Sequence, residues 1–227
     1  PGAGEVTIAV RACGMNFRDV LIVLKPELFQ DHKGDIGFEC SGTIEAIGDG
    51  VAPGLLKVGD TVAAMCNNGG GYGSHAVVKA DGVSVVPHGL PLAAAAAIPA
   101  ASLTAAWCLE RIARLSSGQS MLVHGGAGGV GIAAIQMAAG LGAEVYATVG
   151  KPKKREYLEK ELGVPASHLL NSRSTDFAKQ LKEELASEGG RGGVDLVLNS
   201  RAGADVIEES LSVGAQGGWF SRSCRTA

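Results

Sequence analysis

The sequence predicts an α/β protein in which a doubly wound parallel sheet follows a smaller β-rich part. From about residue 120 onward, short apolar runs alternate with helical segments, as expected for parallel strands that are buried on both faces. Before that, short alternating runs are separated by glycine-rich turns, a pattern that favours a small barrel. We therefore expect a β-rich domain at residues 1–88 and a parallel-sheet domain at residues 89–227.

The β-rich part begins with Val6, Ile8 and Val10, which alternate with other residues at the period of a half-buried strand. A helical turn or short helix is expected at residues 16–24, where the strand pattern is interrupted. Further strands are expected at residues 42–47, 61–65, 75–78 and 83–86.

The second part contains repeated strand and helix units. Its strands are expected at residues 121–124, 144–149, 168–170, 194–198 and 218–221. Its helices are expected at residues 131–141, 153–162, 175–187 and 204–213. Residues 89–109 carry no charge, but alanine dominates them and Pro91 and Pro99 interrupt them, so helices packed into a core are favoured over a membrane span.

The composition excludes several classes of function. The chain of 227 residues has a net charge of −3, which gives no broad positive field for nucleic acid. Its 34 glycines are about twice the usual share and suit backbone that approaches a ligand closely. Its 5 cysteines form no C-x-x-C pair, which argues against a disulfide framework or a structural zinc lobe and fits a reducing, cytoplasmic compartment.

A glycine-rich motif directly follows the first strand of the second part and opens a helix. It has the form G-x-G-x-x-G and comprises Gly126, Ala127, Gly128, Gly129, Val130 and Gly131. Its glycines allow a tight turn, a close approach to a pyrophosphate and close packing of helix on strand, and the helix N-terminus then faces the phosphate. A glycine turn without a ligand is the alternative, which the surrounding strands and helices disfavour.

The end of the second strand indicates which dinucleotide is preferred. Residues 146–150 hold no carboxylate that would bind the ribose of NAD. The cations that follow at once are Lys151, Lys153, Lys154 and Arg155. They would attract a 2′-phosphate and so favour NADPH. The alternative is that these cations only form the solvent-exposed start of a helix and bind no ligand. Asn199 and Ser200 end the fourth strand beside the expected crevice, as ligands of the cofactor or as simple turn residues.

Several segments read together as a family signature. They are RACGMNFRDVL (residues 11–21), GFECSG (37–42), LTA (103–105), LVHGGAGGVG (122–131), TVGKPKKR (148–155), NSRST (171–175) and DLVLNS (195–200). In this order they resemble the enoyl reductase domains of iterative polyketide synthases and animal-type fatty acid synthase, in the medium-chain dehydrogenase/reductase superfamily. The resemblance spans nearly the whole chain.

The resemblance implies a GroES-like barrel joined to a Rossmann domain, and an enzyme that uses NADPH to reduce the α,β double bond of an enoyl thioester. The implied partners are an acyl carrier protein that bears the thioester and neighbouring synthase domains, with a homodimer left open and no nucleic acid or membrane. Catalytic residues are not assigned. The implied cofactor-binding residues are Asn16, Thr104, Gly126, Ala127, Gly128, Gly129, Val130, Gly131, Thr148, Gly150, Lys154, Arg173 and Asn199.

The resemblance also implies a reaction without a metal. Zinc alcohol dehydrogenases of the superfamily place a Cys where this chain has Asn16 and a His where it has Phe38, ahead of a glutamate that matches Glu39. Replacement of two ligands removes an open catalytic zinc site. We expect His124 and Cys108 to lie in the core instead.

Three departures from the family are visible. Polyketide enoyl reductases often carry a tyrosine shortly after the NFRDVL motif, whereas residues 24–29 of this chain hold none. The family's NSL motif is Asn199-Ser200-Arg201 here, with a charge where an apolar residue usually stands. The family's sequence after the fifth strand is not matched by residues 221–227. The few residues that the family carries before the position of Pro1 are also expected to be absent. Both domains are therefore expected to be incomplete, and the chain as given is not expected to reduce an enoyl thioester. Two other functions stay open: a stand-alone quinone or enone oxidoreductase, and a non-catalytic remnant that binds nucleotide weakly.

Overall fold

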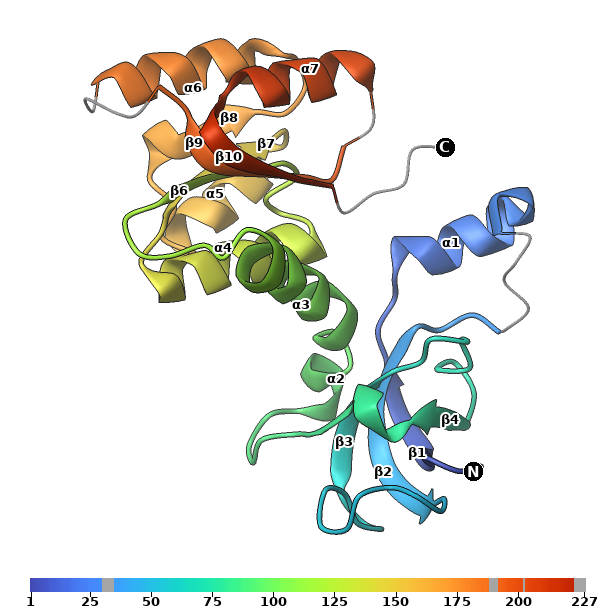
Figure 1. Cartoon of the computed structure of the whole chain (residues 1–227). Coiled ribbons are helices and arrows are strands. Elements are labelled where there is room, and N and C mark those ends of the chain that lie inside the picture. The colour runs from blue at the N-terminus through green and yellow to red at the C-terminus, as the bar shows by residue number, and fades with distance from the viewer. Residues whose placement is uncertain (30–34, 188–191, 202, 223–227) are drawn as a thin grey trace. The chain divides into compact units, whose positions relative to one another are not determined.

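The chain folds into two compact units, residues 1–101 and 102–227 (Figure 1). The computed structural model describes residues 1–29, 35–187, 192–201 and 203–222. The short helix α2 (Leu92–Ala95) contacts two strands of the first unit, β1 (Glu5–Cys13) and β2 (Glu39–Ile47). The first unit therefore extends past residue 88, and the domain boundary expected there stays a prediction.

The first unit is built on an antiparallel sheet in the strand order β4-β1-β2-β3-β5. Val6 and Ile8 on β1 are buried beside Ile44 and Val62, as their alternation predicts. The strand expected at residues 61–65 is confirmed to the residue. The other elements of this unit are α1 (Phe17–Leu24), β3 (Thr61–Met65), β4 (His75–Lys79), β5 (Val83–Val85) and two 3-10 helices, Pro26–Phe29 and Ala80–Gly82.

The second unit is built on a parallel sheet in the order β10-β9-β6-β7-β8. Its strands are β6 (Ser120–Val123), β7 (Glu144–Val149), β8 (Leu169–Asn171), β9 (Val194–Asn199) and β10 (Gly214–Arg222). The chain builds outward from β6 on one side and then crosses to β9 on the other. This reversal opens a crevice at the carboxyl ends of β6 and β9, where ligands of such sheets bind. The predicted doubly wound sheet is confirmed.

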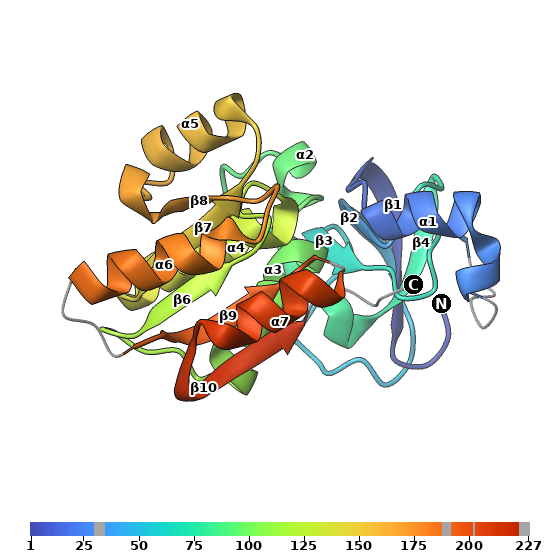
Figure 2. The same ribbon diagram turned by 90° about the horizontal axis from the view of Figure 1, so that it is seen from above.

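Helices cover both faces of this sheet. Figures 1 and 2 show α6 and α7 running side by side on one face and α4 on the other. Buried Phe177, Leu181 and Leu185 form the apolar stripe of α6 that the sequence predicts. The helices are α4 (Gly129–Leu141), α5 (Pro152–Lys160), α6 (Asp176–Ser187) and α7 (Ala204–Ser212), with a 3-10 turn at Ala166–His168.

The uncharged segment at residues 89–109 forms helices, as expected, but in separate pieces. After α2, α3 (Pro99–Ala106) runs into a π-helical turn, Trp107–Ile112, which the sequence analysis did not predict. Cys108 is buried, as expected. In the part of the chain that the structure describes, no helix is long and apolar enough to cross a membrane.

A buried histidine links β6, β7 and α7 through a chain of hydrogen bonds. Ser210 donates its hydroxyl to the carbonyl of Val206, so its oxygen accepts from Nε2–H of His124 at 2.8 Å. Nδ1 of His124 then accepts from the hydroxyl of Thr148 at 3.2 Å, and Thr148 Oγ1 accepts from the N–H of Gly125 at 3.1 Å. The network therefore requires the neutral Nε2–H tautomer of His124.

Burial, followed by the nearby charge of Arg201, lowers the pKa of His124 from 6.5 to about 4. Below about pH 6.5, His124 of the unfolded chain binds a proton, whereas His124 of the folded chain stays neutral until about pH 4. The contribution of this histidine to stability is therefore present at neutral pH and is lost as the pH falls.

We predict that acidification from about pH 7 to about pH 5 costs the wild type about 2 kcal/mol more unfolding free energy than it costs His124→Gln, which cannot titrate. Urea unfolding at the two pH values measures the difference. His88→Gln is the matched control, because His88 is exposed and takes no part in the hydrogen-bond network of His124. Equal acid losses in the wild type and His124→Gln would contradict the prediction.

Candidate functional site

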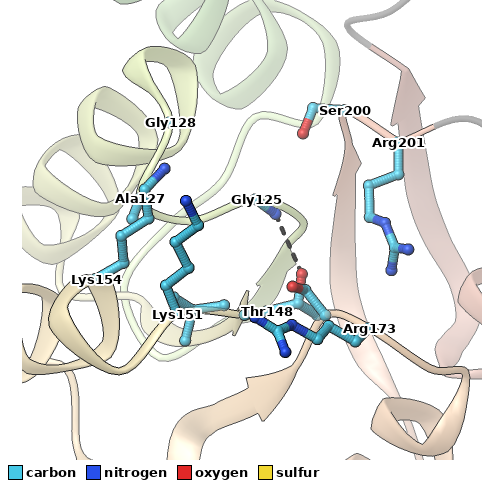
Figure 3. A pocket seen from close by; sticks show the side chains of 12 residues that line it. Gly125, Ala127, Gly128, Thr148, Lys151, Lys154, Arg173, Ser200 and Arg201 are labelled. Atoms are coloured by element: carbon cyan, nitrogen blue, oxygen red, sulfur yellow. Dashed lines mark hydrogen bonds between the residues drawn. The ribbon is translucent and has the colours of Figure 1, made fainter.

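A cavity of about 480 Å³ lies at the carboxyl ends of β6, β7 and β9, where the strand order reverses (Figure 3). The residues that line it are Gly125, Ala127, Gly128, Thr148, Val149, Gly150, Lys151, Lys154, Ser172, Arg173, Ser200 and Arg201. It contains the predicted glycine motif and the predicted basic segment. No carboxylate lines it among the described residues.

The turn between β6 and α4, residues 125–128, forms the floor of this cavity, and we call it the glycine turn. Gly125 has a φ of 65°, a conformation that favours glycine, and its carbonyl accepts from the N–H of Gly128 at 2.8 Å. A Cβ at Gly126 would lie 2.9 Å from Cβ of Ala147, and one at Gly131 would lie 2.6 Å from two carbonyl oxygens of the turn. The glycine turn therefore lies directly against β7 and the first turn of α4.

The first turn of α4 faces the cavity without a side-chain cap. Gly128 is its N-cap and has no side chain to accept from the free backbone N–H groups that follow. Such groups, together with the helix dipole, favour an anion. The glycine turn is thus suited to a phosphate.

Cations line two sides of the cavity. Lys151 and Lys154 approach from the start of α5, with Arg173 from the loop after β8, while Arg201 extends from the end of β9 on the other side of Gly125 (Figure 3). Among the described residues, none of these four side chains has an ion pair with a carboxylate. Their charge is therefore left for an anionic ligand.

Arg155, which the sequence grouped with the lysines, has a different role. Its guanidinium donates to the carbonyls of Leu169 and Ala166 at 2.6 Å each and does not line this cavity. These bonds fasten α5 to the start of β8. Arg155 therefore supports the site from outside, and the sequence pattern could not distinguish it from Lys154.

The structure brings together six of the predicted cofactor-binding residues. Ala127, Gly128, Thr148, Gly150, Lys154 and Arg173 line the cavity. The remaining motif residues, Gly126, Gly129, Val130 and Gly131, complete the glycine turn and the first turn of α4. Asn199 is buried and does not line the cavity, and its Oδ1 atom accepts a hydrogen bond from the N–H of Arg201 at 2.8 Å.

Two predicted residues lie elsewhere in the chain. Thr104 is on α3 and lines another cavity of the second unit, with Leu103 and Trp107. Asn16 belongs to the first unit, where it caps α1 and donates to Glu39. Their roles toward a cofactor stay predictions.

The structure adds residues that the sequence analysis did not assign to the site. They are Gly125, Val149, Ser172 and Arg201. Lys151, which the sequence analysis grouped with the other cations, lines the cavity, whereas Arg201 was visible in the sequence only as a charge in an unusual place. Gly125 precedes the recognised motif by one position, and only the backbone angles reveal that it makes the turn.

The region where zinc relatives hold their metal does not offer a zinc site. Glu39 is buried, and its carboxylate accepts from Nδ2 of Asn16 at 2.9 Å and from the N–H of Ala100 at 2.8 Å. Phe38 is buried under the guanidinium of Arg18, 4.0 Å from the ring centroid. Among the described residues, no group of three His, Cys, Asp or Glu residues could hold a metal ion. The donors present do not fit a catalytic zinc.

Each of the two units matches a known protein family. The family described as alcohol dehydrogenase GroES-like domain matches residues 2–88, and the family described as zinc-binding dehydrogenase matches residues 129–221. A highly reducing polyketide synthase of Emericella nidulans is 42% identical over 215 residues, which cover 95% of this chain and 8% of the synthase. The chain thus spans a small fraction of the length of such relatives.

Two solved structures complete the comparison. The JamJ enoyl reductase in its apo form is 34% identical with a TM-score of 0.86, over 100% of this chain and 68% of the other. A mycobacterial protein solved in complex with NADPH is 30% identical with a TM-score of 0.77, over 97% of this chain and 65% of the other. With the glycine turn and both family matches, these likenesses show that the chain belongs to the enoyl reductase domains of polyketide synthases, in the medium-chain dehydrogenase/reductase superfamily.

Proposed function

We propose that this chain binds NADPH and contributes to the reduction of the α,β double bond of an enoyl thioester. The observation that carries the proposal is the cavity at the carboxyl edge of the parallel sheet, which combines a glycine turn with four cations and no carboxylate among the described lining residues. A dinucleotide with three phosphate groups matches that charge. The mycobacterial neighbour solved with NADPH supports the same assignment.

The glycine turn would hold the diphosphate. Gly128 leaves the backbone open to a phosphate oxygen, and the free N–H groups of the first turn of α4 would donate to it. Thr148 fixes the turn from beneath, because its hydroxyl oxygen accepts the N–H of Gly125. The floor of the site is therefore set before a ligand arrives.

The basic side of the cavity would hold the 2′-phosphate of the adenosine. Lys151, Lys154 and Arg173 line the cavity together with Gly150, where a Cβ would lie 2.8 Å from Oγ of Ser172, so that Ser172 would have to shift to admit a side chain. Charged hydrogen bonds to phosphate are stronger than neutral ones. An acid in this place would instead repel the phosphate and favour NADH.

When bound, NADPH would supply a hydride to the β-carbon of the enoyl thioester. The residues of this chain bind and orient the dinucleotide, and the backbone and side-chain donors around the glycine turn replace water at its phosphates. The thioester would be presented on an acyl carrier protein of the same synthase, since the polyketide synthase relatives are far longer than this chain.

We predict that Lys154→Ala raises the Kd for NADPH about tenfold and leaves that for NADH nearly unchanged, because one charged contact to phosphate is worth about 1–2 kcal/mol. Fluorescence titration with both dinucleotides measures the effect. Lys153→Ala is the matched control, since Lys153 is an exposed neighbour on the same helix and does not line the cavity. An equal loss for both dinucleotides would place the 2′-phosphate elsewhere.

We predict that enoyl reduction requires no zinc, because Asn16 and Phe38 provide no zinc ligands where zinc relatives carry them. Protein expressed from the complete coding sequence should oxidise NADPH in the presence of a crotonyl thioester, before and after prolonged treatment with a chelator. Stoichiometric zinc that is lost together with activity would contradict the prediction. Reduction of quinones but not of the thioester would overturn the proposed substrate.

A further inference from the structure

Arg201 starts from a fixed point beside the glycine turn. Its N–H donates to Oδ1 of buried Asn199 at 2.8 Å, and the hydroxyl of the intervening Ser200 donates to the carbonyl of His124 at 2.7 Å. Ser200 also lies close to Gly125, where a Cβ would come within 3.1 Å of its Oγ. The end of β9 is therefore tied to the end of β6, and the Arg201 side chain enters the cavity from there.

The guanidinium of Arg201 has a donor that the protein leaves unsatisfied. Its Nη1 atom is shielded from solvent and has no hydrogen-bond partner in the described part of the chain. A buried charged donor without a partner costs free energy, and folded proteins contain few such groups. The same side chain lines the cavity, so a rotation of the guanidinium would bring this donor to a ligand oxygen there.

The position of Arg201 distinguishes between the phosphates of the proposed cofactor. The lysines and Arg173 gather at the ends of β7 and β8, whereas Arg201 stands at the end of β9, across Gly125 (Figure 3). The glycine turn between these two groups is where a diphosphate binds in such sheets. Arg201 thus faces the diphosphate position from the side opposite to the 2′-phosphate cations.

We propose that Arg201 is a binding residue for the diphosphate of the dinucleotide, so that a side chain adds to the backbone donors of the glycine turn. This inference rests on the proposed function. A guanidinium can donate two parallel hydrogen bonds to one phosphate, which a neutral side chain at this position cannot do. Arg201 would therefore strengthen the binding of NADPH and NADH alike.

The test compares Arg201→Leu, Arg201→Lys and Lys154→Ala with the wild type, each titrated with NADPH, NADH and adenosine 2′-phosphate. We expect Arg201→Leu to weaken both dinucleotides by about tenfold while the affinity for adenosine 2′-phosphate, which lacks a diphosphate, stays within about twofold. Lys154→Ala should show the opposite pattern, with losses for NADPH and adenosine 2′-phosphate only. Arg201→Lys should recover part of the dinucleotide affinity.

The unchanged binding of adenosine 2′-phosphate by Arg201→Leu shows at the same time that the variant is folded. Equal dinucleotide affinities in Arg201→Leu and the wild type would overturn the inference alone, and so would a loss confined to NADPH, which would assign Arg201 to the 2′-phosphate. Failure of the wild type to bind any dinucleotide would instead overturn the proposed function, and this inference with it.

Discussion

The close contact between the glycine turn and β7 is the constraint on which the second unit depends. Gly126 lies so near Ala147 that even a methyl group would collide with it, and Gly131 lets α4 start directly over the turn. Larger residues would push α4 away from the sheet. The free N–H groups of α4 would then no longer meet the ends of β6 and β7, and the cavity would lose its floor.

Polar groups beneath the turn hold this arrangement from the inside. Thr148 joins the turn to His124, and His124 joins Ser210 on α7, so a hydrogen-bonded line crosses the sheet from the cavity to the helix layer. Every member of the line that the structure describes has a defined donor or acceptor role. Its order depends on an uncharged imidazole, which burial enforces.

Local sequence patterns predicted the parallel sheet well because its strands are buried on both faces. The runs at β6, β7 and β9 are mostly apolar, with few polar residues such as Thr148 and Asp195, and each is followed by a turn or helix signal. The π-helical turn at Trp107–Ile112 was missed, because the change from one helical hydrogen-bond pattern to another leaves no mark in residue type.

The candidate site was predictable in its backbone and less so in its side chains. The glycine motif has a fixed form, whereas the direction of a basic side chain depends on tertiary contacts. Arg155 and Lys154 are neighbours with the same charge, yet one binds the carbonyls of Leu169 and Ala166 and the other lines the cavity. Arg201 is visible in the sequence as a departure from the family, but only the structure shows that its side chain lines the cavity and that its Nη1 atom has no partner among the described residues.

The attachment of Arg155 to the β8 region has a consequence for the entropy of ligand binding. The two carbonyl bonds anchor the first turns of α5 to the sheet layer, and Pro152 restricts the backbone at the start of the helix. Lys151 and Lys154 therefore project from a backbone that is already ordered. An anion that binds them has to immobilise two side chains but no loop, and so it keeps a larger part of its interaction energy as affinity.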